Sequence, residues 1–402
     1  MKNNIKSFFI DDRSLALEEK KKSRSLKFDY LLPMAAILLS GFGLLIIYSA
    51  TRYGMPESAA DPMYYLKRQG YFLGGAVIAF ILIQLINYRI LLKVWWVFFL
   101  INIGALISVI FFGYEVHGSK SWIDFKYFSV QPSEFSKIFM VITVAALLSK
   151  WPREKIGNVG FKKVVLSLLA AIVSIVLVLM EPDYGTALIF FLTYMGMLFI
   201  SGANFLYFLG ISILSAGGFF SAIKIGLIKQ YQLDRILVFI KPDIQKQTIG
   251  YNLFQSKLAI GSGGLWGKGL FLGKQTNLNY VPEHHTDFIF SVVGEEVGFF
   301  GAVAVIFIMA FIIWRCFYIA SKSGNDFGAL IAGGIGFIIL SQAVINIGMT
   351  IGIMPIIGIP LPFLSAGGSN LLAIFLGIAL VENVYLRREL RKSYEIAYEE
   401  FD

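Results

Sequence analysis

The sequence is poor in charged residues and nearly lacks cysteine. Only 15% of its 402 residues are Asp, Glu, Lys or Arg, and 57% are hydrophobic, whereas about 25% charged residues is usual for a soluble domain. So few charges cannot cover a soluble surface, and the single cysteine, Cys316, excludes an internal disulfide. These scarcities exclude a cytosolic enzyme, a disordered chain and a disulfide scaffold. A mean hydropathy of +0.71 indicates an integral membrane protein.

Ten apolar runs are candidates to cross a bilayer, which takes about 20 residues. The second and fourth runs are short, and only Gly202–Asn204 separates the sixth from the seventh. The runs lie at 28–50, 70–86, 92–112, 134–149, 163–180, 185–201, 204–226, 287–314, 327–353 and 366–386. The sequence therefore predicts an all-α membrane protein with ten transmembrane helices.

The distribution of basic residues predicts that both termini are cytoplasmic. With the N-terminus inside, 21 of the 35 Lys and Arg residues fall on the cytoplasmic side, as the positive-inside rule requires. We expect cytoplasmic tails at 1–27 and 391–402, a membrane domain at 28–390, and one long outward loop at about 224–286 between helices 7 and 8. Residues 1–27 mix acids with bases and lead into a full-length span, so they do not resemble a cleavable signal peptide.

Polar residues and helix-breaking segments concentrate on the outer side of this topology. Irregular backbone at membrane depth needs protein or a wet cavity to satisfy its peptide groups, and intramembrane charges are functional candidates. The breaks are Gln131–Ser133, Glu181–Gly185 and Pro360–Gly368, and the charged or titratable residues are Asp124, Glu134, Lys137, Glu181, Asp183, Arg235, Glu283, His284, His285 and Asp287. The sequence predicts an outward-facing polar cavity that holds the chemistry.

Two of these segments have both a structural and a functional interpretation. Glu134 and Lys137 are three residues apart, so they share a helix face and favour a neutralising ion pair; the alternative is that Lys137 contacts substrate. Asp183 lies in a Pro/Gly turn, where turn chemistry explains an Asp; the alternative is that it positions a polar ligand or a metal.

The glycine-rich segment Gln255–Gly269 carries Lys257 and Lys268 and superficially resembles a phosphate-binding loop. It does not match the G-x-x-x-x-G-K-[ST] pattern, because Gly269 follows Lys268, and it lacks a βαβ context. We therefore expect no nucleotide. Binding of a lipid diphosphate fits its basic character, and glycine flexibility alone would also explain it.

The segment Pro282–Phe290 carries the strongest signal. Asp287 stands where the long loop meets the eighth span, so it either caps that helix, together with Thr286, or accepts a proton from a lipid-linked hydroxyl. Glu283 lies beside it. Adjacent histidines need not converge on one ion, so His284 and His285 do not predict a metal site. Farther along, we expect neighbouring helices to satisfy Glu295 and Glu296.

At these motifs the chain resembles the SEDS family (shape, elongation, division and sporulation), and its RodA members more than its FtsW members. The resemblance covers nearly all of residues 28–390, and Gln255–Gly269 looks like the RodA version of the loop. Glu181 and Ala366 depart from the family's common residues. The resemblance is carried by Gly118–Ile123, Gln131–Glu134 with Lys137, Pro182–Thr186, Pro282–Phe290, Gly294–Glu296 and Pro360–Ser369.

The resemblance implies a peptidoglycan glycosyltransferase that polymerises lipid II on the outer face of the cytoplasmic membrane during elongation. It implies a class B penicillin-binding protein as transpeptidase partner, other elongation-complex proteins and membrane lipids as further partners, and no nucleic acid. Asp287 matches the family's essential loop carboxylate, and Glu134 with Lys137 its buried polar pair. Asp183 and Arg235 match functionally important outer positions.

The chemistry is consistent with one carboxylate beside basic residues. A positioned base contributes about 10²–10⁴-fold when it deprotonates an attacking sugar hydroxyl. Diphosphate leaves as an anion and needs positive charge, for which Arg235, Lys137, Lys257, Lys268 or a divalent cation (Mg or Mn) are candidates. Two alternatives stay open from sequence: a flippase for a lipid-linked precursor, which also suits broken helices, and a noncatalytic scaffold.

Overall fold

The computed structural model describes residues 28–53, 61–116, 119–125, 128–149, 159–226, 234–235, 237, 239 and 249–388. The predicted tail 1–27 and the tail 391–402 lie outside the described residues.

Every predicted span corresponds to a helix. Within the described residues, eight helices are long and apolar enough to cross a membrane: α2 (Leu31–Thr51), α3 (Tyr64–Leu85), α5 (Trp95–Phe112), α7 (Phe161–Met180), α9 (Phe205–Lys224), α14 (Gly298–Lys322), α15 (Asp326–Ile351) and α16 (Gly368–Leu386). The helices α6 (Pro132–Leu148) and α8 (Tyr184–Ile200) are shorter, with 17 residues each. The protein is thus a helical multi-pass membrane protein, and its exact number of ten crossings stays a prediction.

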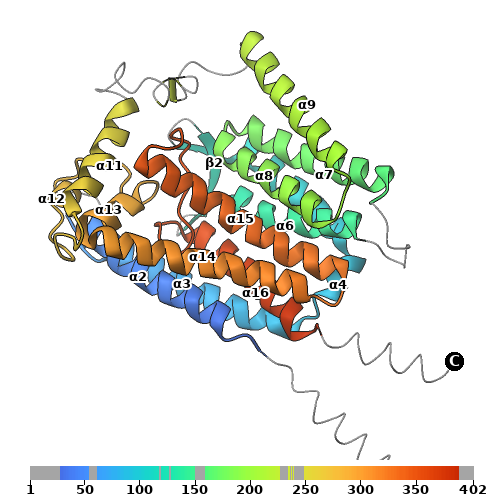
Figure 1. Ribbon diagram of the computed structural model, residues 1–402, viewed down its shortest axis with the longest axis horizontal. Helices are drawn as coiled ribbons and strands as arrows, with labels where there is room; N and C mark the ends of the chain where they lie inside the picture. Colours follow the sequence, from blue (N-terminus) through green and yellow to red (C-terminus); the bar gives the residue numbers. More distant parts are fainter. Residues whose placement is uncertain are drawn as a thin grey trace, which may run out of the picture.

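The helices run side by side along the long axis of the molecule (Figure 1). The most buried of the eight candidate spans are α15 and α16, each with 78% of its apolar window buried. The helix α16 lies against α3, and α15 lies against α8, α14 and α6. The helix α9 leaves most of its surface exposed. A central pair surrounded by lipid-facing helices is the arrangement that apolar sequences adopt when their outer surface meets hydrocarbon.

The eighth predicted span is interrupted, which corrects the prediction of one continuous run at 287–314. A short helix, α13 (Ile289–Glu296), ends at Val297, and α14 begins at Gly298. Gly298 has φ +73°, and its Cα faces the backbone of Gly267 so closely that a Cβ would not fit. A glycine is needed because other residues strain in this conformation.

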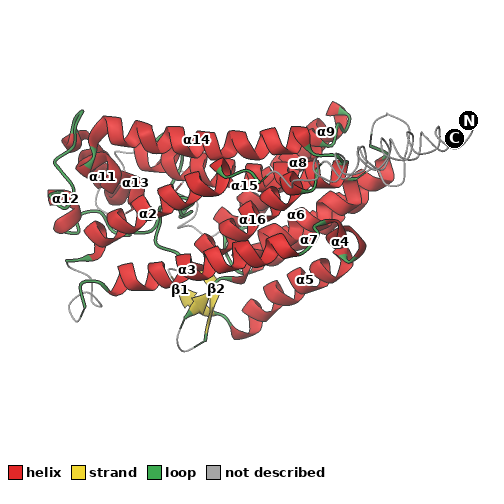
Figure 2. Ribbon diagram, turned by 90° about the horizontal axis from the view of Figure 1, so that it is seen from below, coloured by secondary structure: helices red, strands yellow, loops and turns green. Residues whose placement is uncertain are grey.

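The remaining elements are small. Three short antiparallel strands, β1 (Tyr114–Val116), β2 (Ser119–Asp124) and β3 (Ser129–Val130), precede α6 (Figure 2). This sheet was not predicted. A five-residue helix, α4 (Arg89–Lys93), follows α3. The part of the predicted outward loop from residue 249 onward includes the helices α11 (Ile249–Gly263) and α12 (Lys274–Asn277), and α11 packs on α13 and α15.

Candidate functional site

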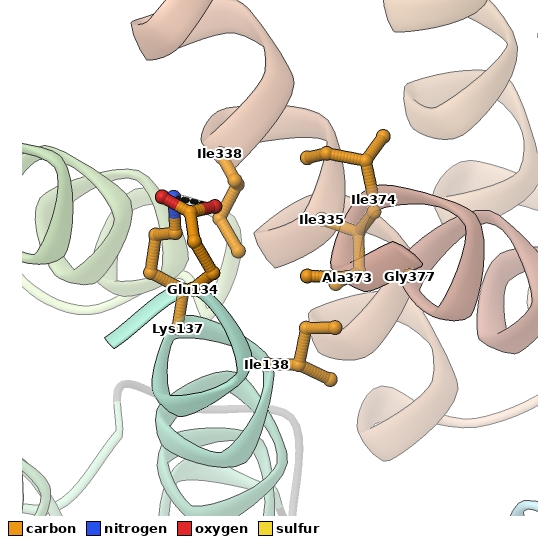
Figure 3. Close-up of a pocket in the computed structure, with 8 residues that line it drawn as sticks. All are labelled: Glu134, Lys137, Ile138, Ile335, Ile338, Ala373, Ile374 and Gly377. Carbon is orange, nitrogen blue, oxygen red and sulfur yellow. Dashed lines mark hydrogen bonds and ion pairs between the residues drawn. The ribbon is translucent and has the colours of Figure 1, made fainter. Parts of the chain in front are cut away.

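The predicted Glu134–Lys137 ion pair is present on α6. Lys137 Nζ lies 2.8 Å from Glu134 Oε2, and both side chains are buried. Asn370 Nδ2 of α16 donates a second hydrogen bond, of 2.7 Å, to the same oxygen. Figure 3 shows the pair beside a cavity of about 10 Å³ that Ile335 and Ile338 help to line, close to the smallest space that holds one water. The geometry supports the structural interpretation of Lys137, since its charge is already neutralised.

Asp183 closes the turn between α7 and α8. It is the N-cap of α8, and its carboxylate accepts hydrogen bonds from Thr186 N (2.9 Å) and Thr186 Oγ1 (2.8 Å). Gln131 Nε2, just before α6, donates a third, of 3.2 Å. The carboxylate thus has the role in the turn that the sequence suggested, and its bond to Gln131 adds a link to α6 that sequence spacing could not indicate.

Three helices begin together at this point. Gln131, the N-cap residue of α6, donates its main-chain N–H to Ser369 Oγ in the first turn of α16 and its side-chain amide to the N-cap of α8. The N-terminal end of a helix carries partial positive charge. Three such ends converge near Asp183, and this convergence makes the region suited to anionic groups.

Asp287 lies in a turn that hydrogen bonds hold against the segment 357–366. Its main-chain carbonyl accepts a 2.7 Å hydrogen bond from Asn346 Nδ2 of α15, which also donates to Ile359 O at 2.7 Å. Thr286 O accepts from Ser365 Oγ at 2.6 Å, and His285 O from Ala366 N at 2.9 Å. The turn that carries the half-buried Asp287 side chain is therefore anchored by its backbone.

The segment 357–359 also connects Asp287 with the Asp183 turn. A Cβ on Gly358 would lie 3.2 Å from Asp287 Oδ2, so the carboxylate rests directly against this exposed glycine. Ile357 and Ile359 pack on Gly185, two residues after Asp183. One wall of the molecule therefore carries both acidic turns.

The sequence suggested that Thr286 or Asp287 caps the helix that follows, but neither residue occupies the N-cap position of α13. The N-cap residue of α13 is Phe288, and it makes no side-chain capping hydrogen bond. Thr286 Oγ1 donates instead to Glu283, at 3.1 Å from its Oε2. Glu283 has φ +53°, a conformation that strains residues other than glycine, which indicates a turn shaped by its surroundings.

The two histidines of the motif have different settings. His284 is buried, and its Nδ1 and Nε2 each lie 2.7 Å from a main-chain carbonyl, of Val281 and Ala50. Both ring nitrogens are thus engaged by protein, which leaves neither for a metal. Burial lowers the pKa of His284, and the two carbonyls oppose this shift. His285 packs edge-on against the Tyr65 ring of α3.

Glu295 and Glu296 anchor the segment 264–280. The expectation that neighbouring helices satisfy them is confirmed for α12 and α2, and loop residues of this segment add further partners. Glu295 accepts from Lys268 Nζ (2.7 Å) and from Thr276 Oγ1 (2.8 Å). Glu296 accepts from Phe271 N at 3.1 Å, and only its bond with Ser49 of α2 comes from a spanning helix. Lys268, a predicted substrate contact, is therefore used to hold the protein's own loop.

The other two predicted basic contacts, Lys257 and Arg235, come from different parts of the chain. The Lys257 side chain is exposed on α11 and lies beside Gly352 at the end of α15. Arg235 lies between α9 and α11, outside the elements that bring Glu134 and Asp183 together. Sequence reasoning missed the buried amides Gln69, Asn346 and Asn370. Their signal was available, because an amide inside an apolar span is costly unless it has partners.

Gln69 of α3 also holds the motif Pro360–Ser369 in place. Its Nε2 donates to Ser365 O at 3.3 Å, and its Oε1 accepts from Gly367 N at 3.2 Å. The break before α16 is thereby held by two spans, α3 and α15. The site is a set of irregular turns, at 131–133, 181–185, 283–288 and 357–367, whose peptide groups are satisfied by buried side chains.

Comparison with known proteins assigns this helical membrane protein to a family. Residues 29–390 match the family of cell cycle proteins that comprises FtsW, RodA and SpoVE. The chain belongs to this family, which confirms the resemblance inferred from its motifs.

Relatives named SpoVE, MrdB and FtsW are similar to the chain. Stage V sporulation protein E of Bacillus subtilis is 34% identical over 89% of this chain and 96% of its own length. The peptidoglycan glycosyltransferase MrdB of Escherichia coli is 33% identical over 73% of this chain and 78% of its own. A probable peptidoglycan glycosyltransferase FtsW of Trichlorobacter lovleyi is 33% identical over 91% and 95%.

Solved structures share the fold. A chain from a peptidoglycan synthase complex, in a study of how polymerisation and crosslinking are coordinated, matches with a TM-score of 0.74 and 26% identity, over 90% of this chain and 98% of that one. The rod shape determining protein RodA of Thermus thermophilus matches with a TM-score of 0.66 and 25% identity over the same shares.

Proposed function

We propose that this protein polymerises lipid II into glycan strands at the outer face of the cytoplasmic membrane, with Asp287 as general base. The observation that carries the proposal is the family match across residues 29–390. Two relatives that align with this chain over most of their own length are named peptidoglycan glycosyltransferases. The chain is therefore assigned to the same class of enzyme. The motif Pro282–Phe290 supplies the carboxylate that this chemistry needs.

The reaction joins two lipid-linked sugars. The acceptor hydroxyl oxygen attacks the anomeric carbon of the donor, a new C–O bond forms, and the bond from that carbon to the diphosphate oxygen breaks. The electron pair leaves with the diphosphate, and the hydroxyl proton passes to the Asp287 carboxylate. Because diphosphate leaves as an anion, no second carboxylic acid is required to protonate it.

The leaving group needs positive charge. Lys137 and Lys268 are paired with Glu134 and Glu295, so we assign the stabilisation to the converging N-terminal ends of α6, α8 and α16. The exposed Lys257 and the half-buried Arg235 are the proposed further contributors from the loop side. Asp183 orders the helix ends through its bonds with Thr186 and Gln131.

The described residues were compared with the needs of a bound metal ion. Among the residues that the structure describes, no three His, Cys, Asp or Glu side chains lie close enough to hold one ion. A divalent cation, Mg or Mn, is therefore proposed only as a companion of the substrate diphosphate, which binds such ions through its own oxygens. Adding EDTA is expected to slow polymerisation, and excess lipid II with Mg is expected to restore it.

A class B penicillin-binding protein is the proposed partner, together with other proteins of the elongation machinery. The similar chain from a peptidoglycan synthase complex supports a partner that crosslinks the strands. The elongation role rests on the segment Gln255–Gly269, which forms α11 and the start of the anchored loop. Depletion of an elongation enzyme rounds the cells, whereas depletion of a division enzyme yields filaments, and this distinguishes the two roles.

The test is polymerisation of fluorescent lipid II by the full chain purified with its partner. Asp287→Asn is expected to lower the rate by at least about 100-fold, the lower end of what a positioned base contributes, with an unchanged thermal unfolding midpoint. Asp326→Asn, an exposed acid in the first turn of α15, is the matched control and should retain activity.

Two outcomes contradict the proposal. Wild-type polymerisation by Asp287→Asn would reject this residue as the base and leave the scaffold role. Lipid translocation in liposomes with no glycan product from the wild-type complex would favour the flippase.

A further inference from the structure

One face of α3 lies against the candidate site. Tyr65, Gln69 and Phe72 are three or four positions apart, so they share this face of the helix. The Tyr65 ring lies 5.3 Å from the His285 ring, Gln69 holds the break before α16, and the Phe72 ring lies against the first residue of α16. Arg68, three positions after Tyr65 and four before Phe72, is the basic residue of this face.

The Arg68 guanidinium meets the strand that leads into α6. Its Nη2 donates a 3.2 Å hydrogen bond to Ser129 Oγ of β3. Ser129 stands two residues before Gln131, which donates to Ser369 at the start of α16 and to Asp183 at the start of α8. Arg68 is therefore held beside the helix starts that Gln131 joins.

The Arg68 charge is not neutralised within the part of the chain that the structure describes. None of the ion pairs formed there includes Arg68, and a neutral hydroxyl positions a guanidinium without compensating its charge. Asp124, opposite Ser129 in the pairing of β2 with β3, is exposed and forms no ion pair with Arg68. Arg68 is half-buried, and its Nε and Nη1 are not among the buried atoms without a partner. These donors are therefore accessible to a ligand.

Positive charge accumulates where Arg68 lies. The N-terminal ends of α6, α8 and α16 carry partial positive charge, and Arg68 adds a full charge on a spanning helix. The acids nearest these helix starts are already engaged, because Glu134 pairs with Lys137 and Asp183 accepts three hydrogen bonds. Charges of like sign that share a site repel one another. A bound anion would relieve this repulsion, so the arrangement fits an anionic ligand.

We propose that Arg68 is a fixed cationic contact for the diphosphate of the lipid-linked sugar donor. The inference rests on the proposed function and adds to it a binding residue from a spanning helix. A guanidinium presents paired N–H donors in the geometry that phosphate oxygens accept. When the bond from the anomeric carbon to the diphosphate oxygen breaks, the electron pair stays on that oxygen, and Arg68 stabilises the added negative charge. Arg68 donates hydrogen bonds and keeps its proton, because arginine is not deprotonated in proteins.

The first test is polymerisation of lipid II by the full chain purified with its partner. Arg68→Gln is expected to lower kcat/KM about 100-fold, on the scale of removing one donor to a developing anion. Arg68→Lys keeps the charge but loses the paired donors, and should lower kcat/KM about tenfold. Lys67→Gln is the matched control, because Lys67 is the neighbouring base, is 54% exposed and pairs with Asp61. It should keep the wild-type rate.

Ser129→Ala separates the charge of Arg68 from its structural contact. This variant removes the hydrogen bond that holds the guanidinium and leaves the guanidinium itself. It should stay within about threefold of the wild-type kcat/KM, the scale of one neutral hydrogen bond. A loss as large as that of Arg68→Gln would make the contact structural and overturn the proposal, as would a wild-type kcat/KM in Arg68→Gln.

The second test measures binding by thermal unfolding, without turnover. Undecaprenyl diphosphate, inorganic diphosphate and phosphatidylglycerol are added in separate arms. Undecaprenyl diphosphate is expected to raise the unfolding midpoint in a saturable way, because a ligand of the native state stabilises it. Arg68→Gln should weaken its apparent affinity about tenfold, the scale of a hydrogen bond to a charged group. Inorganic diphosphate should show the same dependence on Arg68 with lower affinity, since it lacks the prenyl chain.

The binding test distinguishes this inference from the proposed function. Equal affinity of Arg68→Gln and the wild type for undecaprenyl diphosphate would overturn the inference. So would an equal, Arg68-dependent stabilisation by phosphatidylglycerol, which would assign Arg68 to anionic membrane lipid. Arg68-dependent binding of undecaprenyl diphosphate by a wild-type complex that makes no glycan would contradict the proposed function and support the diphosphate contact.

Discussion

The buried carboxyl groups of this protein are of two kinds, those that pair with a lysine and those that do not. Glu134 and Glu295 each lie within 2.8 Å of a lysine ammonium group. Glu181, in the turn after α7, is 1% exposed, and within the described residues neither of its oxygens has a hydrogen-bond partner. Burial, and next the nearby Asp183, raise the pKa of Glu181 to about 9. Glu181 is therefore neutral in the folded protein at neutral pH.

The neutral Glu181 makes stability fall as pH rises. The unfolded chain ionises this group near its ordinary value of 4.5, and the folded chain keeps the proton up to about pH 9. Between these values the folded state binds more protons, so the free energy of unfolding decreases with pH. Glu181→Gln is expected to raise the unfolding midpoint at pH 8 by about 2–4 °C and to change it little at pH 5. Glu115→Gln, at an exposed position on β1, is the control. A lower midpoint of Glu181→Gln at pH 8 would show that Glu181 is ionised.

Gly358 determines the space around Asp287. It has φ +75°, and an added Cβ would lie 3.2 Å from Asp287 Oδ2. Gly358→Ala is expected to lower polymerisation about 10- to 100-fold, because a small displacement of a reacting group is costly. Gly202→Ala is matched for backbone strain, with φ +70° and open space around it, and should keep most activity. Equal losses in the two variants would contradict a specific effect on Asp287.

At the scale of elements, the short helix α13 holds both the segment 264–280 and the turn that carries Asp287. Its last two residues, Glu295 and Glu296, bind the segment 264–280, and its first residue follows the turn with Asp287. The break at Gly298 separates this short helix from α14, which lets α13 take its own direction. The anchored loop and the candidate base are thus attached to one rigid element.

Removing the Glu295 side chain should free the segment 264–280 from α13. Glu295→Ala eliminates the acceptor for Lys268 Nζ, Gln275 N and Thr276 N, and buried donors left without a partner are costly. Trypsin is expected to cut at Lys268 and Lys274 at least about ten times faster, because local opening determines cleavage. Asp326→Ala is the control, and an unchanged cleavage pattern in Glu295→Ala would show that other contacts hold the segment.

At the scale of the whole molecule, the candidate site and the basic residues Arg387 and Arg388 occupy opposite ends of α16. The helix joins Ser369, which accepts from Gln131, to Arg387, which donates to Gln84. The positive-inside rule predicts that the end with Arg89, Arg387 and Arg388 faces the cytoplasm. On this prediction, the site end, with α11 and the segment 264–280, faces outward.

Labelling with a membrane-impermeant maleimide tests this orientation. Cys316 is buried, so Cys316→Ser gives a background without reactive thiols. In that background Trp266→Cys, at a position 79% exposed, is expected to react in intact cells, and Lys322→Cys only after the membrane is opened. The reverse pattern would invert the topology and contradict an outward active site.

The sequence by itself determined the membrane class, the positions of the helices and the Glu134–Lys137 pair. These features depend on hydropathy and on contacts between residues three or four apart, which are local. The sequence also identified Pro282–Phe290, because charges and helix breakers are conspicuous in an apolar chain. Its expectation of a continuous eighth span was wrong, since periodicity does not reveal that Gly298 must approach Gly267.

Only the tertiary structure decided which distant groups meet. Asn370 reaches Glu134 across 236 positions, and His284 reaches Ala50 across 234. The pairing of Lys268 with Glu295, against its predicted role toward substrate, has the same origin. A buried polar group must find a partner, and which partner it finds depends on how the helices pack. The spacing of residues along the chain therefore does not predict which partner a buried polar group will meet.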